Sequence, residues 1–361
     1  MSLHVPPVTA EIVAAARQRL GRNDVLIGVA DPAEYAEAEA LSRAAHPSEM
    51  KSVLTAESIA WFIERNPCGR GFLVLARDPS TRGVIGYFLF YPWLIAHRGE
   101  REAEVRPAFL YVHLYVAPAH RRRRVFSAMT SFGLDLVEQL GVGLAYTVPN
   151  PRSTPGFLKF GMRQAGTLPF WIRPVVPGWA RAAGARRDPA LSVQQVPLPT
   201  ADAADVTSML PESTTAWSPR TTAVVQWRYR DRPGSAYQIR QVSRSGRPIA
   251  VVVTRQMTIK GLRTLVVCDA WFSESGPQAM RMAIDDALAG GARVHLAIAF
   301  GGSASPAYAA ALRGGGFRVC PPAIQPQPVA IIGGEVGGPG RRVAMPDVRA
   351  WHLTPFDWDV F

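Results

Sequence analysis

One stretch decides the fold: residues 110–129 read LYVHLYVAPAHRRRRVFSAM. An apolar strand that ends at Val116 passes through a proline turn and four consecutive arginines into a helix expected over Ser127–Leu140. The first amides of a helix have no partner within the helix, and the helix dipole adds positive charge beside the arginines. The stretch therefore predicts an anion site that suits a pyrophosphate.

The residues around this stretch alternate between short apolar runs, which predict strands, and segments of helical spacing. The turn Asp78–Thr81 separates two of the apolar runs and predicts a hairpin. The expected order is strand, two helices, three strands, helix, strand. We expect strands at Val25–Val29, Gly71–Ala76, Val84–Tyr91, Ala108–Val116 and Leu144–Val148, and helices at Pro32–Ala45, Ala56–Arg65 and Ser127–Leu140.

The C-terminal half follows a similar α/β plan, although no residue-level repeat links the halves. A chain of 361 residues exceeds the size at which one core usually keeps growing. A segment rich in Pro, Ala, Gly and Arg predicts a linker at 177–192, between domains at 1–176 and 193–361. In the second half we expect strands at Val193–Val196, Tyr237–Val242, Arg247–Arg255, Arg263–Phe272, Val294–Phe300 and Val329–Ile332, and helices at Pro277–Ala289 and Ala307–Arg313.

The opening stretch resembles the signature of the GNAT superfamily of N-acyltransferases. That signature is a strand, Val-x-Pro, Gln or Arg, two residues, Gly, one residue, and Gly or Ala. Val116, Pro118 and Arg121 match it. The resemblance implies an α/β fold with two GNAT-like domains, each a mixed, mostly antiparallel twisted sheet flanked by helices, of which the second is degenerate.

The resemblance also implies a donor site. In the family, the strand backbone pairs with pantetheine and the turn and helix amides hold the pyrophosphate of an acyl-CoA. Leu114, Tyr115 and Val116 would hold the pantetheine, Asn150 would contact its arm, and Phe157 would lie near the thioester. The expected phosphate-binding residues are Arg121, Arg122, Arg123, Arg124, Val125, Phe126 and Ser127.

Two departures from the family pattern affect the predicted chemistry. Arg124 and Phe126 stand where the family has glycine and a small residue, so the close approach of a pyrophosphate is partly obstructed. Phe157 stands where many members have the Tyr that protonates the leaving thiolate. An arginine-rich turn on a degenerate acyltransferase fold is the alternative interpretation.

A general base must lie within hydrogen-bond reach of the attacking amine. Counted back from Arg121, the strand positions on the active face are Leu110 and Val112, and both are apolar. Strict alternation turns His113 to the other face, with Tyr111 and Tyr115. A β-bulge would turn His113 in, which makes it the candidate catalytic residue; a structural histidine is the alternative.

Charge and cysteine content limit which partners the protein is expected to bind and in which cellular compartment it is expected to be found. The formal charge of +12 favours an anionic partner such as coenzyme A, an acidic acyl-carrier protein or RNA, although scattered solvated arginines would also explain it. Without a secretory signal or an apolar run of about 18 residues, we expect a cytoplasmic protein that does not bind membranes. Cys68, Cys268 and Cys320 are widely spaced, so we expect reduced core residues and no metal site.

Three functions fit these observations. The first is transfer of an acyl group from acyl-CoA or an acyl-carrier protein to an amine, expected to be a small molecule. The second is aminoacyl transfer from tRNA, as in Fem-type transferases, where the basic charge would serve RNA. The third is a non-catalytic binding module. The second half carries Glu274 and no arginine in its corresponding turn, so we expect one donor site per chain, and we expect the aromatic, acidic tail from Trp351 to dock.

Overall fold

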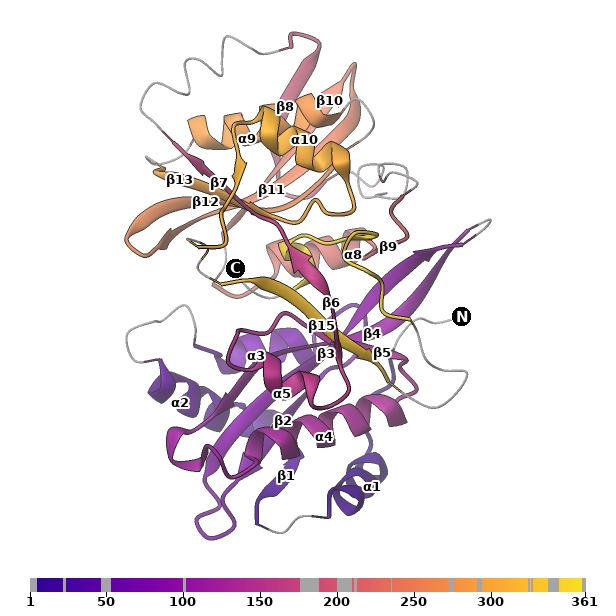
Figure 1. Ribbon diagram of the computed structural model, residues 1–361, viewed down its shortest axis with the longest axis vertical. Helices are drawn as coiled ribbons and strands as arrows, with labels where there is room; N and C mark the ends of the chain where they lie inside the picture. Colours follow the sequence, from indigo (N-terminus) through magenta and orange to yellow (C-terminus); the bar gives the residue numbers. More distant parts are fainter. Residues whose placement is uncertain are drawn as a thin grey trace. The chain divides into compact units, whose positions relative to one another are not determined.

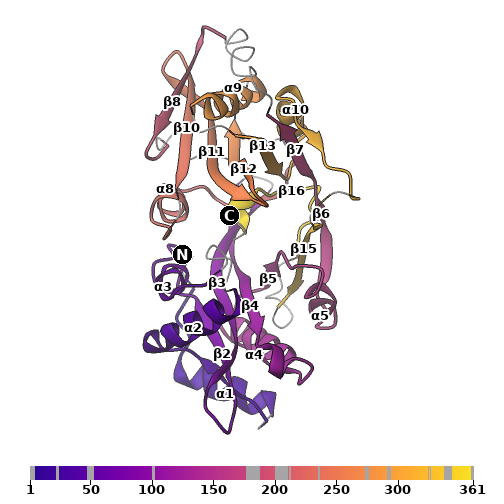
Figure 2. The ribbon, with the colours of Figure 1, turned by 90° about the vertical axis from the view of Figure 1, so that its left-hand side faces the viewer.

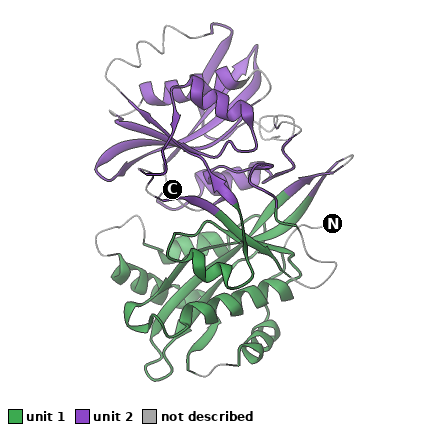
Figure 3. Ribbon diagram, viewed as in Figure 1, with its two compact units in different colours: residues 1–95, 105–165, 331–345 green, residues 96–104, 166–330, 346–361 purple. Residues whose placement is uncertain are grey.

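The structure is a computed structural model whose strands and helices form two compact units (Figure 3). Unit 1 comprises residues 1–95, 105–165 and 331–345, and unit 2 comprises residues 96–104, 166–330 and 346–361. The structure describes residues 5–21, 24–46, 53–99, 102–175, 188–199, 210, 213–234, 236–272, 276–290, 294–323, 325, 327–336 and 344–358.

Unit 1 is built on a mixed sheet with the strand order β1-β2-β3-β4-β5-β15 (Figures 1 and 2). β4 and β5 run parallel, whereas β1–β2, β2–β3 and β5–β15 are antiparallel. The strands are β1 (Leu26–Val29), β2 (Phe72–Arg77), β3 (Val84–Arg98), β4 (Ala103–Val116), β5 (Leu144–Thr147) and β15 (Val329–Glu335). The helices are α1 (Ala10–Leu20), α2 (Tyr35–Ala45), α3 (Ala56–Ile63), α4 (Val125–Gln139) and α5 (Thr154–Leu158), with 3-10 turns η1 (Pro32–Glu34) and η3 (Pro118–His120).

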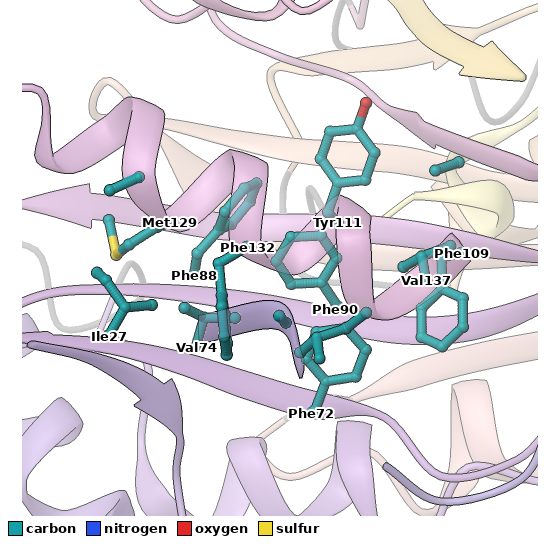
Figure 4. Packing of buried hydrophobic residues seen from close by; sticks show 14 of the residues in the cluster. Ile27, Phe72, Val74, Phe88, Phe90, Phe109, Tyr111, Met129, Phe132 and Val137 are labelled. Atoms are coloured by element: carbon teal, nitrogen blue, oxygen red, sulfur yellow. The ribbon is translucent and has the colours of Figure 1, made fainter. Parts of the chain in front are cut away.

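The main core of unit 1 lies between this sheet and the helices α1 and α4. Aromatic rings from neighbouring strands meet there: Phe72 and Phe90 stack with centroids 4.9 Å apart, and Tyr111 lies 5.7 Å from Phe90 (Figure 4). On the opposite face, Phe62 of α3 packs 4.9 Å from Tyr91 of β3. Burial of rings this large removes much apolar surface from water and holds the helices on both faces of the sheet.

Unit 2 is built on a second sheet with the order β14-β7-β13-β12-β11-β10-β8, in which only the β12–β13 pairing among the described registers is parallel. The strands are β7 (Phe170–Pro174), β8 (Leu191–Val196), β10 (Tyr237–Arg244), β11 (Arg247–Ile259), β12 (Leu262–Phe272), β13 (Leu296–Phe300) and β14 (Arg318–Val319). The helices are α8 (Thr222–Val225), the π-helix η5 (Gln226–Arg230), α9 (Gly276–Ala289) and α10 (Pro306–Gly314). Shorter elements are β9 (Ala216–Trp217), β16 (Trp351–His352) and the 3-10 turn η6 (Pro355–Asp357).

All the strands and helices predicted above are present, with ends that differ by a few residues or extend further. Sequence reasoning missed α1, β7 and β6 (Arg163–Leu168), whose residues divide between the two units. The protein has the mixed α/β architecture that was expected, with two mostly antiparallel sheets flanked by helices.

The two units do not divide the chain at the expected linker. β7 precedes that linker, yet it pairs with β13 in unit 2, and β15 follows it, yet it pairs with β5 in unit 1. Residues 177–187 of the expected linker lie outside the described residues, and β8 begins at Leu191. A strand belongs to the sheet whose edge it pairs with, so chain order alone does not assign it.

The cysteines fit their predicted role. Cys68, Cys268 and Cys320 are free and buried. Burial raises the pKa of the Cys68 and Cys268 thiols to about 12, so both are neutral core residues. No helix in the described part of the chain is long and apolar enough to cross a membrane.

Candidate active site

β4 is one continuous strand with an irregular residue, His113, and we call this position the break. The φ of His113 is 51°, in the left-handed region that non-glycine residues rarely adopt. Phe109 and Tyr111 belong to the core beneath α4, and Leu114 and Val116 pack against the same core. Regular alternation would place Tyr111 and Leu114 on opposite faces, because they are three residues apart. β4 therefore contains one extra residue, which is the bulge that the sequence analysis required for His113 to change face.

The pairing between β4 and β5 ends just before this break. The parallel register contains two residue pairs, of which the last joins Leu110 to Tyr146, although β4 continues to Val116. Beyond the last pair, the Thr147 hydroxyl donates a buried hydrogen bond of 2.7 Å to the carbonyl of Tyr111. A side chain thus satisfies the carbonyl at the end of the ladder, and β5 itself ends at Thr147, whereas β4 continues to Val116.

The turn after β4 keeps a backbone shape that the family builds with glycine. The amide of Ala117 donates to the carbonyl of Ile85 at 2.8 Å and anchors the end of β4 to β3. Arg122 and Arg124 have φ values of 64° and 57°. Holding a non-glycine residue in this region costs roughly 1–2 kcal/mol. Because left-handed Arg124 is followed by helical Val125, successive amides point to one side and form a nest suited to an anion.

The four turn arginines surround the N-terminus of α4, where no side chain caps the helix. The Nε atom of Arg121 donates to the carbonyl of Val116 at 3.1 Å, and its guanidinium lies 5.8 Å from the centre of the Tyr115 ring. Arg123 lies 3.3 Å from Nδ1 of His120. The side chains of Arg121, Arg122, Arg123 and Arg124 are all exposed, and in the chain they directly precede the first residues of α4, which are Val125, Phe126 and Ser127.

Phe126 directs its ring toward α5. Its centroid lies 5.3 Å from Phe157 and 6.4 Å from Phe160. A Cβ atom on Gly156 would come within 2.6 Å of this ring, so the contact depends on glycine at that position. Phe157 is 2% exposed, and its ring centroid lies 5.3 Å from that of Tyr111. The bulky residue at the family's small position is thus accommodated by packing between α4 and α5.

Asn150 organises the loop that leads from β5 to α5. Its Oδ1 atom accepts hydrogen bonds from the amides of Arg152 at 2.9 Å and Ser153 at 3.1 Å. This geometry fixes the side chain at the start of the turn. It leaves the Nδ2 group as the one that the predicted contact with a pantetheine arm would use.

His113 lies on the α3 side of the sheet. Its half-buried ring meets Phe62 of α3 edge-on, with centroids 5.7 Å apart. Tyr115 is on the same side, where it stacks 5.8 Å from Tyr87. Of the two residues expected to share a face with His113, Tyr115 does so and Tyr111 does not, because the bulge separates Tyr111 from His113. His113 thus flanks the break while facing away from the main core.

Sequence reasoning missed two residues of this site. Thr147 ends the β4–β5 pairing, and no motif marks it. Tyr111 is fully buried with its hydroxyl 2.6 Å from the sulfur of Met162, and burial raises its pKa well above 10. Tyr111 therefore keeps its proton at neutral pH.

Comparison with known proteins identifies the fold. No family model matches the sequence, and no curated protein matches it. Among solved structures, a probable N-acyltransferase from Enterococcus faecalis covers 86% of this chain and 72% of its own length, with a TM-score of 0.59 and 14% identity. The fold is that of the GNAT acyltransferases.

Two further GNAT-fold structures give the same result. A GCN5-related N-acetyltransferase from Anabaena variabilis has a TM-score of 0.57 and 11% identity, over 86% of this chain and 72% of its own. The Saccharomyces cerevisiae N-myristoyltransferase, solved with myristoyl-CoA, has a TM-score of 0.58 and 11% identity, over 94% of this chain and 86% of its own. The GNAT likeness thus extends over most of the chain.

Proposed function

We propose that this protein is an N-acyltransferase that moves an acyl group from a phosphopantetheine thioester to an amine. The observation that carries the proposal is the break of β4 at His113, followed by the arginine turn at the N-terminus of α4. An open strand edge and an anion site then lie at one end of the same strand. The GNAT fold and the similarity to N-acyltransferases support this reaction class.

In this proposal the donor lies extended beside the edge of β4 between the break and Val116. Its amide groups pair with the strand backbone, as the resemblance implies. Its phosphates bind the amides of Val125 to Ser127 and the guanidinium groups of Arg121 to Arg124. Charge-assisted hydrogen bonds of this kind are short and about twice as strong as neutral ones.

The thioester carbonyl would then lie at the break in β4. The amine attacks the carbonyl carbon, the new C–N bond forms, and the C–S bond breaks. His113 would take the proton that the amine loses, directly or through a water molecule. Phe157 carries no hydroxyl, so the thiolate would take its proton from solvent. Backbone amides at the break would stabilise the oxyanion that forms on the carbonyl oxygen.

Both acyl-CoA and an acyl-carrier protein present this arm, and the basic turn suits either. We expect the acceptor to be a small-molecule amine. Isothermal titration with coenzyme A, with phosphopantetheine-loaded carrier protein and with bulk tRNA separates the possible donors. Binding of tRNA alone would favour an aminoacyl transferase, and binding of none of the three would contradict the proposal.

The reaction itself is tested by mass spectrometry of acyl-CoA incubated with a panel of primary amines. His113→Gln should lower kcat at saturating donor while leaving the affinity for coenzyme A nearly unchanged, because this histidine would act on the reacting amine and not on the donor phosphates. Equal losses of donor affinity and kcat would make His113 a structural residue. For variants of the arginine turn, an exposed arginine of unit 2, Arg263, provides a charge-matched control as Arg263→Ala.

A further inference from the structure

Unit 2 contains a strand opening of its own. The parallel pairing of β12 with β13 ends at Val266 and Ile298, although β12 runs on to Phe272. The register between β11 and β12 shifts after this point, because Val253 pairs with Asp269 and the next β11 residue pairs with Val267. Cys268 is thus the extra residue of a bulge in β12.

This opening resembles the one in unit 1 in the position of its bulge and in the spacing of its core-facing residues, although Asp269 does not have the positive φ of His113. Asp269 follows the last paired residue of β12 by three positions, and His113 follows the last paired residue of β4 by the same interval. The core-facing residues repeat with identical spacing of two, three and two. They are Phe109, Tyr111, Leu114 and Val116 in β4, and Leu265, Val267, Ala270 and Phe272 in β12.

The C-terminal segment Trp351–Trp358 fills the opening of unit 2. At the β12 side, the hydroxyl of Thr354 donates to Oδ1 of Asp269 at 2.7 Å. At the β13 side, the carbonyl oxygen of Leu353 passes so close to Gly301 that a Cβ atom there would lie 2.1 Å from it. Trp358 meets Phe300 edge-on at 6.3 Å. The segment therefore contacts both separated strands.

Buried charges hold this segment in place. Arg220 contacts Asp269 of β12 at 3.2 Å and Asp357 of the segment at 3.3 Å, and all three side chains are fully buried. Arg228 donates to the carbonyls of Pro355 and Trp358. Buried charges are tolerated only when they are paired and hydrogen-bonded, so the segment supplies groups that Arg220 and Arg228 require.

We propose that unit 2 carries a second arm-binding opening and that the chain's own segment Trp351–Trp358 is its resident ligand. The inference rests on the proposed function of unit 1 for the statement that such an opening accepts a thioester arm. This segment, a short strand followed by the 3-10 turn η6, takes the place of the arm in unit 2, with Asp357 paired to Arg220. The chain consequently binds one donor. The turn with Glu274 lies outside the described residues.

Hydrogen exchange on the full-length chain tests the inference. Thr354→Val removes one hydrogen bond to a buried carboxylate, and Thr354→Ser is the matched control that keeps it. We expect the valine variant to exchange roughly tenfold faster or more at residues 351–358 and at the facing ends of β12 and β13, with β10 and β11 unchanged. The serine variant should exchange like the wild type.

Coenzyme A is the probe for the donor. It should slow exchange in β4 and α4 and leave residues 351–358 unchanged, with one molecule bound per chain. Two outcomes would overturn the inference: faster exchange throughout unit 2 in Thr354→Val, which would make the segment an inseparable part of the core, or release of the segment by coenzyme A. If neither coenzyme A nor a phosphopantetheine-loaded carrier protein binds, the proposed function fails, while the exchange of the Thr354 variants still decides the inference.

Discussion

The two strand openings share a backbone plan and differ in what lines them. In unit 1, the break carries half-buried His113 and leads into four exposed arginines. In unit 2, the equivalent position carries Asp269, which is fully buried against Arg220 and Thr354. The comparison teaches that the bulge and the strand separation belong to the fold, whereas the side chains decide whether the opening receives a ligand or a segment of the same chain.

The largest expected effect concerns the buried charges of unit 2. Arg220→Met leaves Asp269 and Asp357 buried without their shared cation, and we expect it to lower the free energy of unfolding by about 3–5 kcal/mol. Arg121→Met removes an exposed cation in unit 1 and should change stability by less than about 0.5 kcal/mol. Urea denaturation followed by circular dichroism measures both. Equal effects would mean that the two openings do not differ in their dependence on charge.

The next largest effect concerns the affinity for the donor, which only the opening of unit 1 is expected to bind. Arg121→Ala and Arg123→Ala should each weaken coenzyme A binding by roughly 1.5–3 kcal/mol, since each removes a charge-assisted contact to phosphate. Turnover at saturating donor should change much less, because the arginines are remote from the reacting carbon. Calorimetric titration provides the affinity, and Arg263→Ala should leave it unchanged. Unaltered affinity in the turn variants would make the arginines a surface feature.

Thr147 tests whether the end of the β4–β5 pairing positions the donor. Thr147→Val leaves the buried carbonyl of Tyr111 without its partner and should cost about 1–3 kcal/mol of stability. If the carbonyl then competes for the donor's amides, the KM for acyl-CoA should also rise while kcat changes little. Thr147→Ser should restore both quantities. A stability loss with unchanged KM would confine Thr147 to a structural role.

The smallest expected effect is a dependence of stability on pH that arises from a histidine of unit 2. Burial, with a contribution from Arg220, holds the pKa of His352 well below 6.5. The unfolded chain therefore binds more protons below pH 6.5, and stability falls as the pH is lowered through that value, by up to about 1.4 kcal/mol per pH unit. Asp357, whose pKa burial raises, acts in the opposite direction at lower pH. Unfolding curves at pH 7.5, 6.5 and 5.5 should lose this slope in His352→Gln.

The elements around the candidate site were predictable because their signals are local. Helical spacing, apolar runs and turn residues lie within a few positions of one another, so the strand ending at Val116 and the helix after the arginines could be recognised directly. The sequence did not predict the bulge at His113; it predicted only that His113 would change face if a bulge were present. Alternation specifies which face a residue takes in a regular strand, but a single left-handed residue reverses every face after it.

The amino-acid sequence alone determined the α/β order, the arginine turn before α4 and the resemblance to GNAT acyltransferases, because each depends on neighbouring residues. The tertiary structure alone decided that β7 and β15 join sheets across the expected boundary, that Thr147 ends a strand pairing, and that Trp351–Trp358 fills the opening beside Asp269. These features depend on hydrogen bonds and burial between residues far apart in the chain. Which of several possible partners a residue contacts depends on the whole folded molecule, so no local sequence pattern predicts these contacts.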